Sequence, residues 1–314
     1  MTDIALLSFA IQVIGPVVLL IAFGYLLYKT DLMNEDFVGR ASRLIFNFAL
    51  PALLFSSISR SELALLDKMD AIAVGVVGTL SIVCLLILVV PFIIRRRADR
   101  GVVMQGAFRA NLGIVGLAYC ANAYGEEGLV FASVYLGALT IVYNFLSVII
   151  LHYYSGNSFS LGRITKSIIT NPIILSIVLA LAVNYFSVPV PAIIGNSIGY
   201  FAQLTLPLAL LCTGASLRFS SLHQDAYPAI VSISVKVLLY PIVVVGLALC
   251  FDLSGMILGI VYLMAVCPTA AASYVMTRKI GGNHQLAAHI VAFSTLVSVP
   301  TTIIGYGLIA PWLS

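Results

Sequence analysis

Ten stretches of about 20 apolar residues fill almost all of this chain of 314 residues. A hydrocarbon core about 30 Å thick is crossed by an α-helix of roughly 20 residues, so each stretch is long enough to span a bilayer. With 61% hydrophobic and 9% charged residues, a soluble domain would expose large apolar patches. The sequence therefore predicts an all-α integral membrane protein with ten transmembrane helices. They are expected at 5–27, 37–58, 70–93, 102–124, 128–151, 168–186, 191–216, 226–250, 255–278 and 286–312.

Lys and Arg side chains are distributed unevenly between the two sets of alternating loops. One set, with its helix ends, holds Lys29, Arg40, Arg43, Arg95, Arg96, Arg97, Arg100, Arg163, Lys166, Arg218, Arg278 and Lys279. The other set holds only Arg60 and Lys68. Because cytoplasmic loops are enriched in Lys and Arg, the first set is expected in the cytoplasm and both termini outside it. The net charge of +4 thus reports topology, and no nucleic-acid-binding motif accompanies it.

An internal repeat relates the two halves of the chain. The second stretch contains NFALPALLFSSIS and the seventh QLTLPLALLCTGAS, which align Asn47 with Gln203 and Pro51 with Pro207 at an offset of 156 residues. Weaker matches at 150 or 156 residues are Pro91 with Pro241, Ala118 with Pro268, Gly125 with Gly281 and Asn144 with Pro300. Five spans per half is an odd number, so the halves 1–155 and 156–314 would be inverted repeats, as in many secondary transporters. The alternative is chance similarity between apolar helices that contain proline.

Two of the expected helices contain segments that disfavour a continuous helix. Asn111, Gly113 and Gly116 have poor helix propensity, and Pro268 lacks a backbone donor and disrupts the preceding turn. A broken helix inside a bilayer is tolerated where it is buried in protein or lines a wet cavity, and its new N-terminus favours an anion. The segments therefore predict a midplane anion site formed by spans four and nine. The alternative is a pair of kinks that serve packing.

Several segments resemble the auxin efflux carrier family, which includes plant carriers and bacterial organic-anion carriers of the bile acid/auxin carrier superfamily. They are ANLGIVGLAYCANAYG at 110–125, TNP at 170–172, CPTAAASYVMTRKIGG at 267–282 and the prolines of spans two and seven. The resemblance covers essentially all ten spans. Ala110 and Ala118 stand where prolines are often found in the family, so the first break would depend on Gly113 and Gly116.

The resemblance implies that spans four and nine cross as broken helices and that Asn111 binds the substrate carboxylate, with Pro268 as the crossover proline. Asn171 and Pro172 would begin the sixth span near the cavity. Spans 1, 2, 6 and 7 would form a scaffold that supports a homodimer, and spans 3–5 and 8–10 a transport bundle with elevator-type alternating access. A bacterial inner membrane is the expected location, and a carboxylate such as malate or malonate is a better expectation than auxin.

Charged groups inside the spans are positive, because all 12 Asp and Glu residues fall in loops or at span ends. Lys236 would either satisfy carbonyls of a broken helix or replace a coupling cation. Arg109 would snorkel to the cytoplasmic face or contact the substrate. His289 would be packed or interfacial, or else titrate during transport. The five cysteines are expected to be small buried hydrophobes.

The sequence therefore predicts a secondary transporter of small organic anions, with no catalytic residue, metal or cofactor. The expected substrate-binding residues are Asn111, Leu112, Gly113, Cys267, Pro268, Thr269, Asn47, Gln203 and Asn171, with charge roles for Lys236, Arg109 and His289. Asn47 and Gln203 could alternatively join helices. Rival functions are a channel or sensor on the same fold, a sodium symporter like the bile-acid carriers, and an intramembrane enzyme. The GNSIG segment at 195–199 matches a hydrolase pattern, but it lies in an expected helix and suits helix packing.

Overall fold

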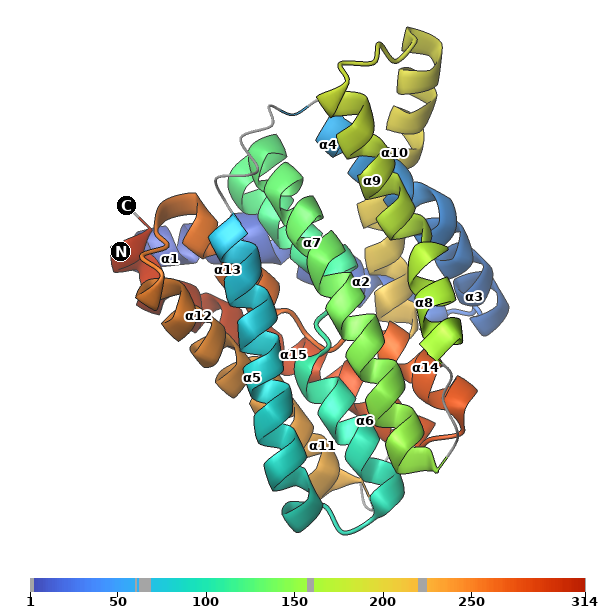
Figure 1. Ribbon diagram of the computed structural model, residues 1–314, viewed down its shortest axis with the longest axis vertical. Helices are drawn as coiled ribbons and strands as arrows, with labels where there is room; N and C mark the ends of the chain where they lie inside the picture. The colour runs from blue at the N-terminus through green and yellow to red at the C-terminus, as the bar shows by residue number, and fades with distance from the viewer. Residues whose placement is uncertain (1–2, 60, 62–68, 157–160, 220–224, 314) are drawn as a thin grey trace.

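The fold is described by a computed structural model that covers residues 3–59, 61, 69–156, 161–219 and 225–313 (Figure 1). These residues are helical, apart from connecting segments and one isolated β-bridge. Arg60, Lys68 and the loop 157–160 at the expected repeat boundary lie outside them. The helices are α1 Asp3–Phe9, η1 Ala10–Ile14, α2 Gly15–Lys29, α3 Glu35–Leu44, η2 Ile45–Ala49, α4 Leu50–Ser59, α5 Met69–Ile93, α6 Arg97–Phe108, η4 Leu112–Gly116, α7 Leu117–Ser155, α8 Leu161–Ile169, α9 Pro172–Tyr185, α10 Ala192–Ala215, α11 Ala226–Ser234, η5 Val235–Leu239, α12 Tyr240–Cys250, α13 Gly255–Val266, α14 Ala272–Ile280, α15 His284–Ile309 and η6 Ala310–Trp312.

Seven helical segments in the described part of the chain are long and apolar enough to cross a membrane. They are Leu6–Lys29, Glu35–Ser59, Met69–Ile93, Leu112–Ser155, Ala192–Ala215, Ala226–Cys250 and His284–Trp312. The expectation of ten stretches differs from this number for two reasons. The expected fourth and fifth spans share the segment Leu112–Ser155, and the sixth and ninth contain the shorter apolar helices Pro172–Tyr185 and Gly255–Val266.

The long helix α7 contains a reversal of the chain at Gly125. This residue has φ 61° and ψ −145°, a backbone conformation that lies outside the helical region and that residues with a Cβ rarely adopt. The part of α7 after Gly125 then runs antiparallel to α6, because Arg97 bonds the Tyr153 carbonyl and Arg109 bonds the Tyr143 carbonyl. The expected separation of spans four and five is therefore present as a sharp turn at Gly125 inside α7.

Three π-helical turns lie directly before prolines. The turns η1, η2 and η5 each end two residues before a proline, at Pro16, Pro51 and Pro241 respectively. Proline removes one N–H donor and its ring crowds the carbonyl four residues earlier, and a π-turn widens the helix at this point. These helices thus continue through the proline with a local change in the direction of their side chains.

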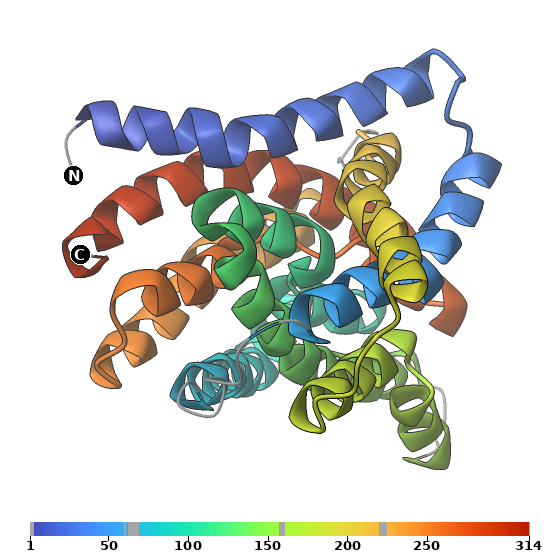
Figure 2. The same cartoon turned by 90° about the horizontal axis from the view of Figure 1, so that it is seen from above.

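Apart from α1, α8 and η6, the described helices pack as two sets. The first helix set consists of η1, α2, α3, η2, α4, α9 and α10, and the second of α5–α7 and α11–α15 with η4 and η5. In Figure 1, α4, α9 and α10 occupy the upper right, whereas α5 and α12 lie on the left and α6 and α11 at the bottom. The two termini lie close together in Figures 1 and 2, where Phe9 of α1 stacks on Tyr306 of α15 with ring centroids 3.6 Å apart.

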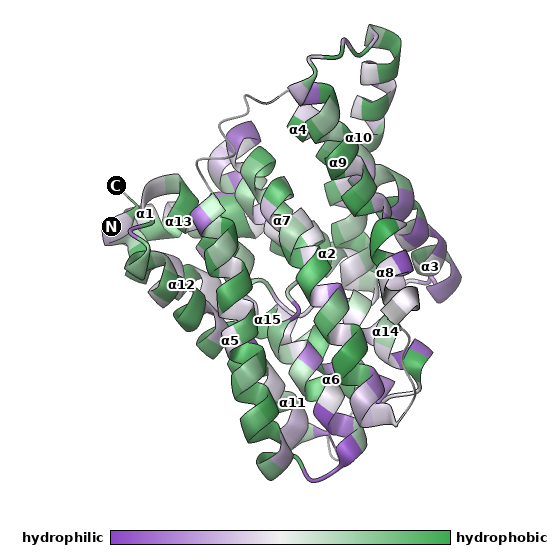
Figure 3. Ribbon diagram, in the orientation of Figure 1, coloured by the Kyte–Doolittle hydropathy of each residue, from purple (hydrophilic) through white to green (hydrophobic). Residues whose placement is uncertain are grey.

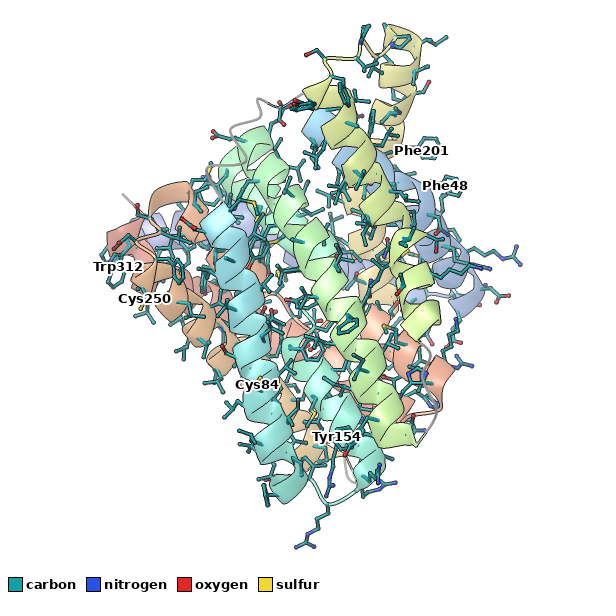
Figure 4. All side chains as sticks on the ribbon, viewed as in Figure 1. Phe48, Cys84, Tyr154, Phe201, Cys250 and Trp312 are labelled. Atoms are coloured by element: carbon teal, nitrogen blue, oxygen red, sulfur yellow. The ribbon has the colours of Figure 1, made fainter. Side chains whose placement is uncertain are left out.

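The outer surface suits a hydrocarbon environment. Hydrophilic residues gather on α3, α14 and the beginning of α6, while the long sides of α5 and α12 are hydrophobic (Figure 3). Phe48 and Phe201 point away from the ribbon in Figure 4 and are 62% and 45% exposed. The expectation that all cysteines are buried is wrong for Cys84 and Cys250, which are exposed. A thiol behaves as a small apolar group, so facing lipid does not cost it the free energy that exposure to water would.

Candidate functional site

The two interruptions expected from the sequence lie side by side and pair with each other. α6 ends at Phe108 and α13 ends at Val266, and the segments that follow form an antiparallel bridge between Ala110 and Thr269. The Asn111 N–H donates to the Pro268 carbonyl at 2.8 Å, and the Ala270 N–H donates to the Arg109 carbonyl at 2.9 Å. We call this arrangement the paired break. It satisfies backbone groups that helix termination would leave without partners inside the bilayer.

Local sequence explains why each helix ends there. Cys267 adopts φ −51° and ψ 143°, the extended conformation favoured before a proline such as Pro268. Arg109 and Asn111 have ψ values of 92° and 60°, outside the helical range. Gly116 allows η4 to approach α13, because a Cβ at this position would lie 2.6 Å from the Met264 sulfur. The first break thus depends on close packing against the second.

Side chains complete the hydrogen bonding of the paired break. Thr269 Oγ1 donates to the Gly106 carbonyl at 2.7 Å, and its N–H donates to Ser294 Oγ at 3.1 Å. Lys236 is fully buried, and its Nζ donates to the Ala265 carbonyl at 2.9 Å near the end of α13. Two roles were expected for Lys236. Its hydrogen bond fits the first of them, which is to satisfy a carbonyl of a broken helix.

A pocket of about 260 Å³ lies beside the paired break, and we call it the front pocket. It lies between the first helix set and the second, because η2, α4 and α9 supply one wall and α7 and α14 supply the other. Five of the expected substrate-binding residues line it, and Arg109 does so as well. The lining residues are Phe46, Asn47, Leu50, Leu136, Thr140, Tyr143, Asn144 and the segments 109–114, 171–173 and 270–272.

Three helix N-termini converge on the front pocket. η4 and α7 begin after Asn111, α9 begins after Asn171, and α14 begins after Ala271. The first N–H groups of each helix lack intrahelical partners, and each N-terminus carries roughly half a positive charge. The Asn171 side chain caps its helix by accepting from the Ile173 N–H at 2.9 Å, whereas the Asn111 side chain forms no such cap. The Asn111 amide is thus available to a solute.

Arg109 adds a full positive charge to this wall of the front pocket. Its guanidinium donates to the Tyr143 carbonyl at 3.3 Å, to Ser147 Oγ at 3.1 Å and to Asn144 Oδ1 at 2.9 Å. The residue is only 9% exposed, so the expectation that it snorkels to the cytoplasmic face is wrong. Its acceptors on α7 hold the side chain at the depth of the paired break. None of the described residues that line the pocket is Asp or Glu.

The other expected site residues lie elsewhere. Cys267 is buried and its Sγ donates to the Leu263 carbonyl, while Pro268 lines a separate apolar pocket of about 180 Å³. Gln203 lines a third pocket, described below. His289 is 4% exposed, and its Nδ1 lies 3.7 Å from Asp225 Oδ2, so it is packed inside the protein.

Sequence reasoning did not assign Thr140, Tyr143 or Asn144 to the site, although all three line the front pocket. One signal for Asn144 was present, since an amide in the middle of an apolar span needs a polar partner. That partner is Arg109, which lies 35 positions earlier in the chain. The pairing depends on the reversal at Gly125, and sequence periodicity does not reveal how far a chain turns at one residue.

Comparison with known proteins gives a consistent group of relatives. The family model described as "membrane transport protein" matches residues 9–161 and 157–306. An "Uncharacterized transporter" of Methanothermobacter thermautotrophicus is 25% identical over 92% of this chain and 94% of its own. A "Putative malonate transporter" of Rhizobium meliloti is 27% identical over 90% of each chain. "Auxin efflux carrier component 3a" of Oryza sativa subsp. japonica is 25% identical over 46% of this chain and 24% of its own.

Proposed function

Because the chain belongs to the membrane transport protein family, as the resemblance to auxin efflux carriers predicted, we propose that it is a secondary transporter of small organic anions. One observation carries the proposal. Three helix N-termini and the Arg109 guanidinium meet at one pocket whose described lining contains no carboxylate. Such a site attracts a carboxylate by charge and binds it through backbone and amide N–H groups.

The size and charge of the front pocket favour a short carboxylate. Three helix N-termini at roughly +0.5 each, together with one guanidinium, amount to about +2.5, which a dianion neutralises more nearly than a monoanion does. The volume of about 260 Å³ is smaller than most sites for drug-sized ligands. Malonate or malate suits these limits better than auxin does, and the name of the Rhizobium relative supports the first of them.

We infer that transport occurs by elevator-type alternating access. The first helix set would be the scaffold, support a homodimer and face the second set, which carries the paired break. The matches at 156 residues and the proximity of the two termini support two inverted five-helix repeats with crossing broken helices. The front pocket would then face the cytoplasm. Two of its lining residues, Asn47 and Asn171, come about one helical turn after Arg43 and Lys166, which belong to the Lys- and Arg-rich helix ends expected on the cytoplasmic side.

A thermal-shift experiment on the purified protein tests the proposed substrate class. Malonate and malate should raise the apparent melting temperature, because a ligand that binds only the native state stabilises it by mass action. Acetate, indole-3-acetate and chloride at equal ionic strength are the comparison ligands. If no carboxylate shifts the melting temperature beyond the chloride control, the proposed anion site is wrong.

Flux experiments in proteoliposomes distinguish a carrier from its rivals. Unlabelled malonate inside the liposomes should accelerate uptake of labelled malonate by a carrier, whereas a channel gives no such counterflow. Replacement of sodium by potassium at a fixed membrane voltage should leave uptake unchanged. Uptake that requires sodium would instead support the symporter alternative, and flux without counterflow would support a channel.

A further inference from the structure

A further pocket, of about 360 Å³, lies beside the first turns of α7, the helix that follows the first break. We call it the rear pocket. The first helix set contributes Pro16, Val17, Gln203 and Leu206 to its lining, and the second set contributes Ala118 and Asn122 of α7. Asn122 lies one helical turn before Glu126, on the side away from the Lys- and Arg-rich helix ends. The rear pocket thus lies at the boundary between the same two helix sets as the front pocket, toward the opposite membrane face.

The walls of the two pockets correspond through the internal repeat. An offset of 156 residues relates Asn47 and Leu50 of the front pocket to Gln203 and Leu206 of the rear pocket. The same offset in the other direction relates Pro172 and Ile173 to Pro16 and Val17. In each pocket the remaining wall includes the helix that follows one break, α14 in the front and α7 in the rear.

One hydrogen bond joins the two helix sets beside the rear pocket. Asn122 Nδ2 on α7 donates to the Val13 carbonyl in η1 at 2.9 Å. Among the side-chain hydrogen bonds that join two described residues, it alone connects the first helix set with the second. A hydrogen bond has a fixed geometry and must break when the two sets move apart.

We propose that the rear pocket is the outward-facing half of the transport path, that the hydrogen bond from Asn122 to Val13 holds the two helix sets together beside it, and that Gln203 contacts the substrate when the two sets move apart. The inference rests on the proposed transport function. Asn47 and Gln203 then have the same task in opposite states, since each supplies an amide from the scaffold to a carboxylate at the paired break. Asn122 would then favour the arrangement in which the two helix sets lie together at the rear pocket.

Labelling of one introduced cysteine tests whether the Asn122 bond restrains the rear pocket. Leu206→Cys is placed in a chain whose five native cysteines are replaced by serine, and right-side-out vesicles receive a membrane-impermeant maleimide. Asn122→Ala should accelerate labelling about three- to tenfold, the factor expected for one hydrogen bond. Asn122→Leu, which keeps the side-chain volume, serves if the alanine variant does not fold.

A matched control is Asn184→Ala. The Asn184 amide also donates to a backbone carbonyl, that of Ile58 at 2.9 Å, but both residues belong to the first helix set. Its loss should therefore leave labelling of the introduced cysteine unchanged. Equal labelling rates with and without the Asn122 substitution would overturn this role of Asn122. Acceleration by both substitutions would show general loosening and overturn it as well.

The role of Gln203 is tested by the direction of transport. Gln203→Leu should raise the KM for labelled malonate several-fold in right-side-out vesicles and leave it unchanged in inside-out vesicles, and Asn47→Leu should do the reverse. Equal effects on both sides would overturn the assignment of Gln203 to the outward-facing state. If malonate causes no thermal shift in the unmodified protein, the proposed substrate class fails, but the labelling experiment still decides whether the rear pocket opens outward.

Discussion

The Arg109 guanidinium donates a hydrogen bond of 2.9 Å to Oδ1 of Asn144, across the turn at Gly125 that returns α7 alongside α6. This pair holds a cation at the depth where two helices are interrupted. The same guanidinium is shared with the Tyr143 carbonyl and Ser147 Oγ, so its orientation is fixed before any solute binds. Preorganisation of this kind reduces the entropy lost on binding.

Arg109→Gln should weaken binding of malonate about 10- to 100-fold, because a hydrogen bond to a charged group contributes about 1.5–3 kcal/mol. Arg109→Lys should retain part of the affinity, since an ammonium keeps the charge but not the planar fork. Binding is measured by isothermal titration calorimetry. Arg97→Gln is the control, because Arg97 bonds a carbonyl of α7 at Tyr153 but does not line the front pocket. Equal losses in both variants would show that Arg109 acts only in packing.

Asn111→Ala should abolish the thermal shift caused by malonate and leave the melting temperature without ligand nearly unchanged. The paired break uses the backbone N–H of Asn111, which the alanine retains, while its side chain forms no helix cap. The measurement is a melting curve in detergent with and without malonate. Loss of the folded protein would instead make the Asn111 side chain a structural element.

Gly116→Ala should lower the melting temperature, because its Cβ would lie 2.6 Å from the Met264 sulfur and 3.3 Å from the Cys267 sulfur. Overpacking of this kind costs typically about 1–3 kcal/mol. The second substitution Met264→Ala should recover part of the loss. Gly246→Ala is the control, since its Cβ would meet no atom within 4 Å. A Gly116→Ala variant as stable as the control would show that η4 does not depend on this approach.

Lys236→Met should destabilise the folded protein by about 1–3 kcal/mol, the cost of leaving a buried acceptor unsatisfied. The acceptor is the Ala265 carbonyl, close to the end of α13. Methionine preserves the length and most of the volume of the lysine, so the loss reports the ammonium group. Reversible melting in detergent provides the measurement. An unchanged melting temperature would mean that water or a neighbouring donor replaces the amine.

The sequence was sufficient to predict the membrane class and both interruptions, because hydrocarbon length and proline chemistry act locally. It was insufficient to predict the number of long helices. Gly125 turns the chain inside α7, so two expected spans belong to one long helix, and the helix Pro172–Tyr185 is shorter than the apolar stretch that contains it. Arg109 shows the same limit in the site. Its distance from the membrane face favoured snorkelling, but acceptors on the returning half of α7 hold it inside.

The sequence showed which residues of the two halves correspond, but it did not show where each of them lies in the fold. Asn47 and Gln203 were matched from sequence as equivalent amides, and both were expected in one binding site. The structure places Asn47 at the front pocket and Gln203 at the rear pocket. If the repeat is inverted, as we propose, equivalent residues would lie on opposite sides of the centre, so similarity of sequence alone would not bring them together.

The bond from the Asn111 N–H to the Pro268 carbonyl has a consequence for biosynthesis. Residues around Asn111 enter the membrane long before Pro268 leaves the ribosome, and during that interval a peptide donor lies in lipid without its final partner. Such an exposed group costs several kcal/mol. The nascent chain therefore needs water, the insertion machinery or a temporary helical hydrogen bond at this position until the last third of the polypeptide has been made.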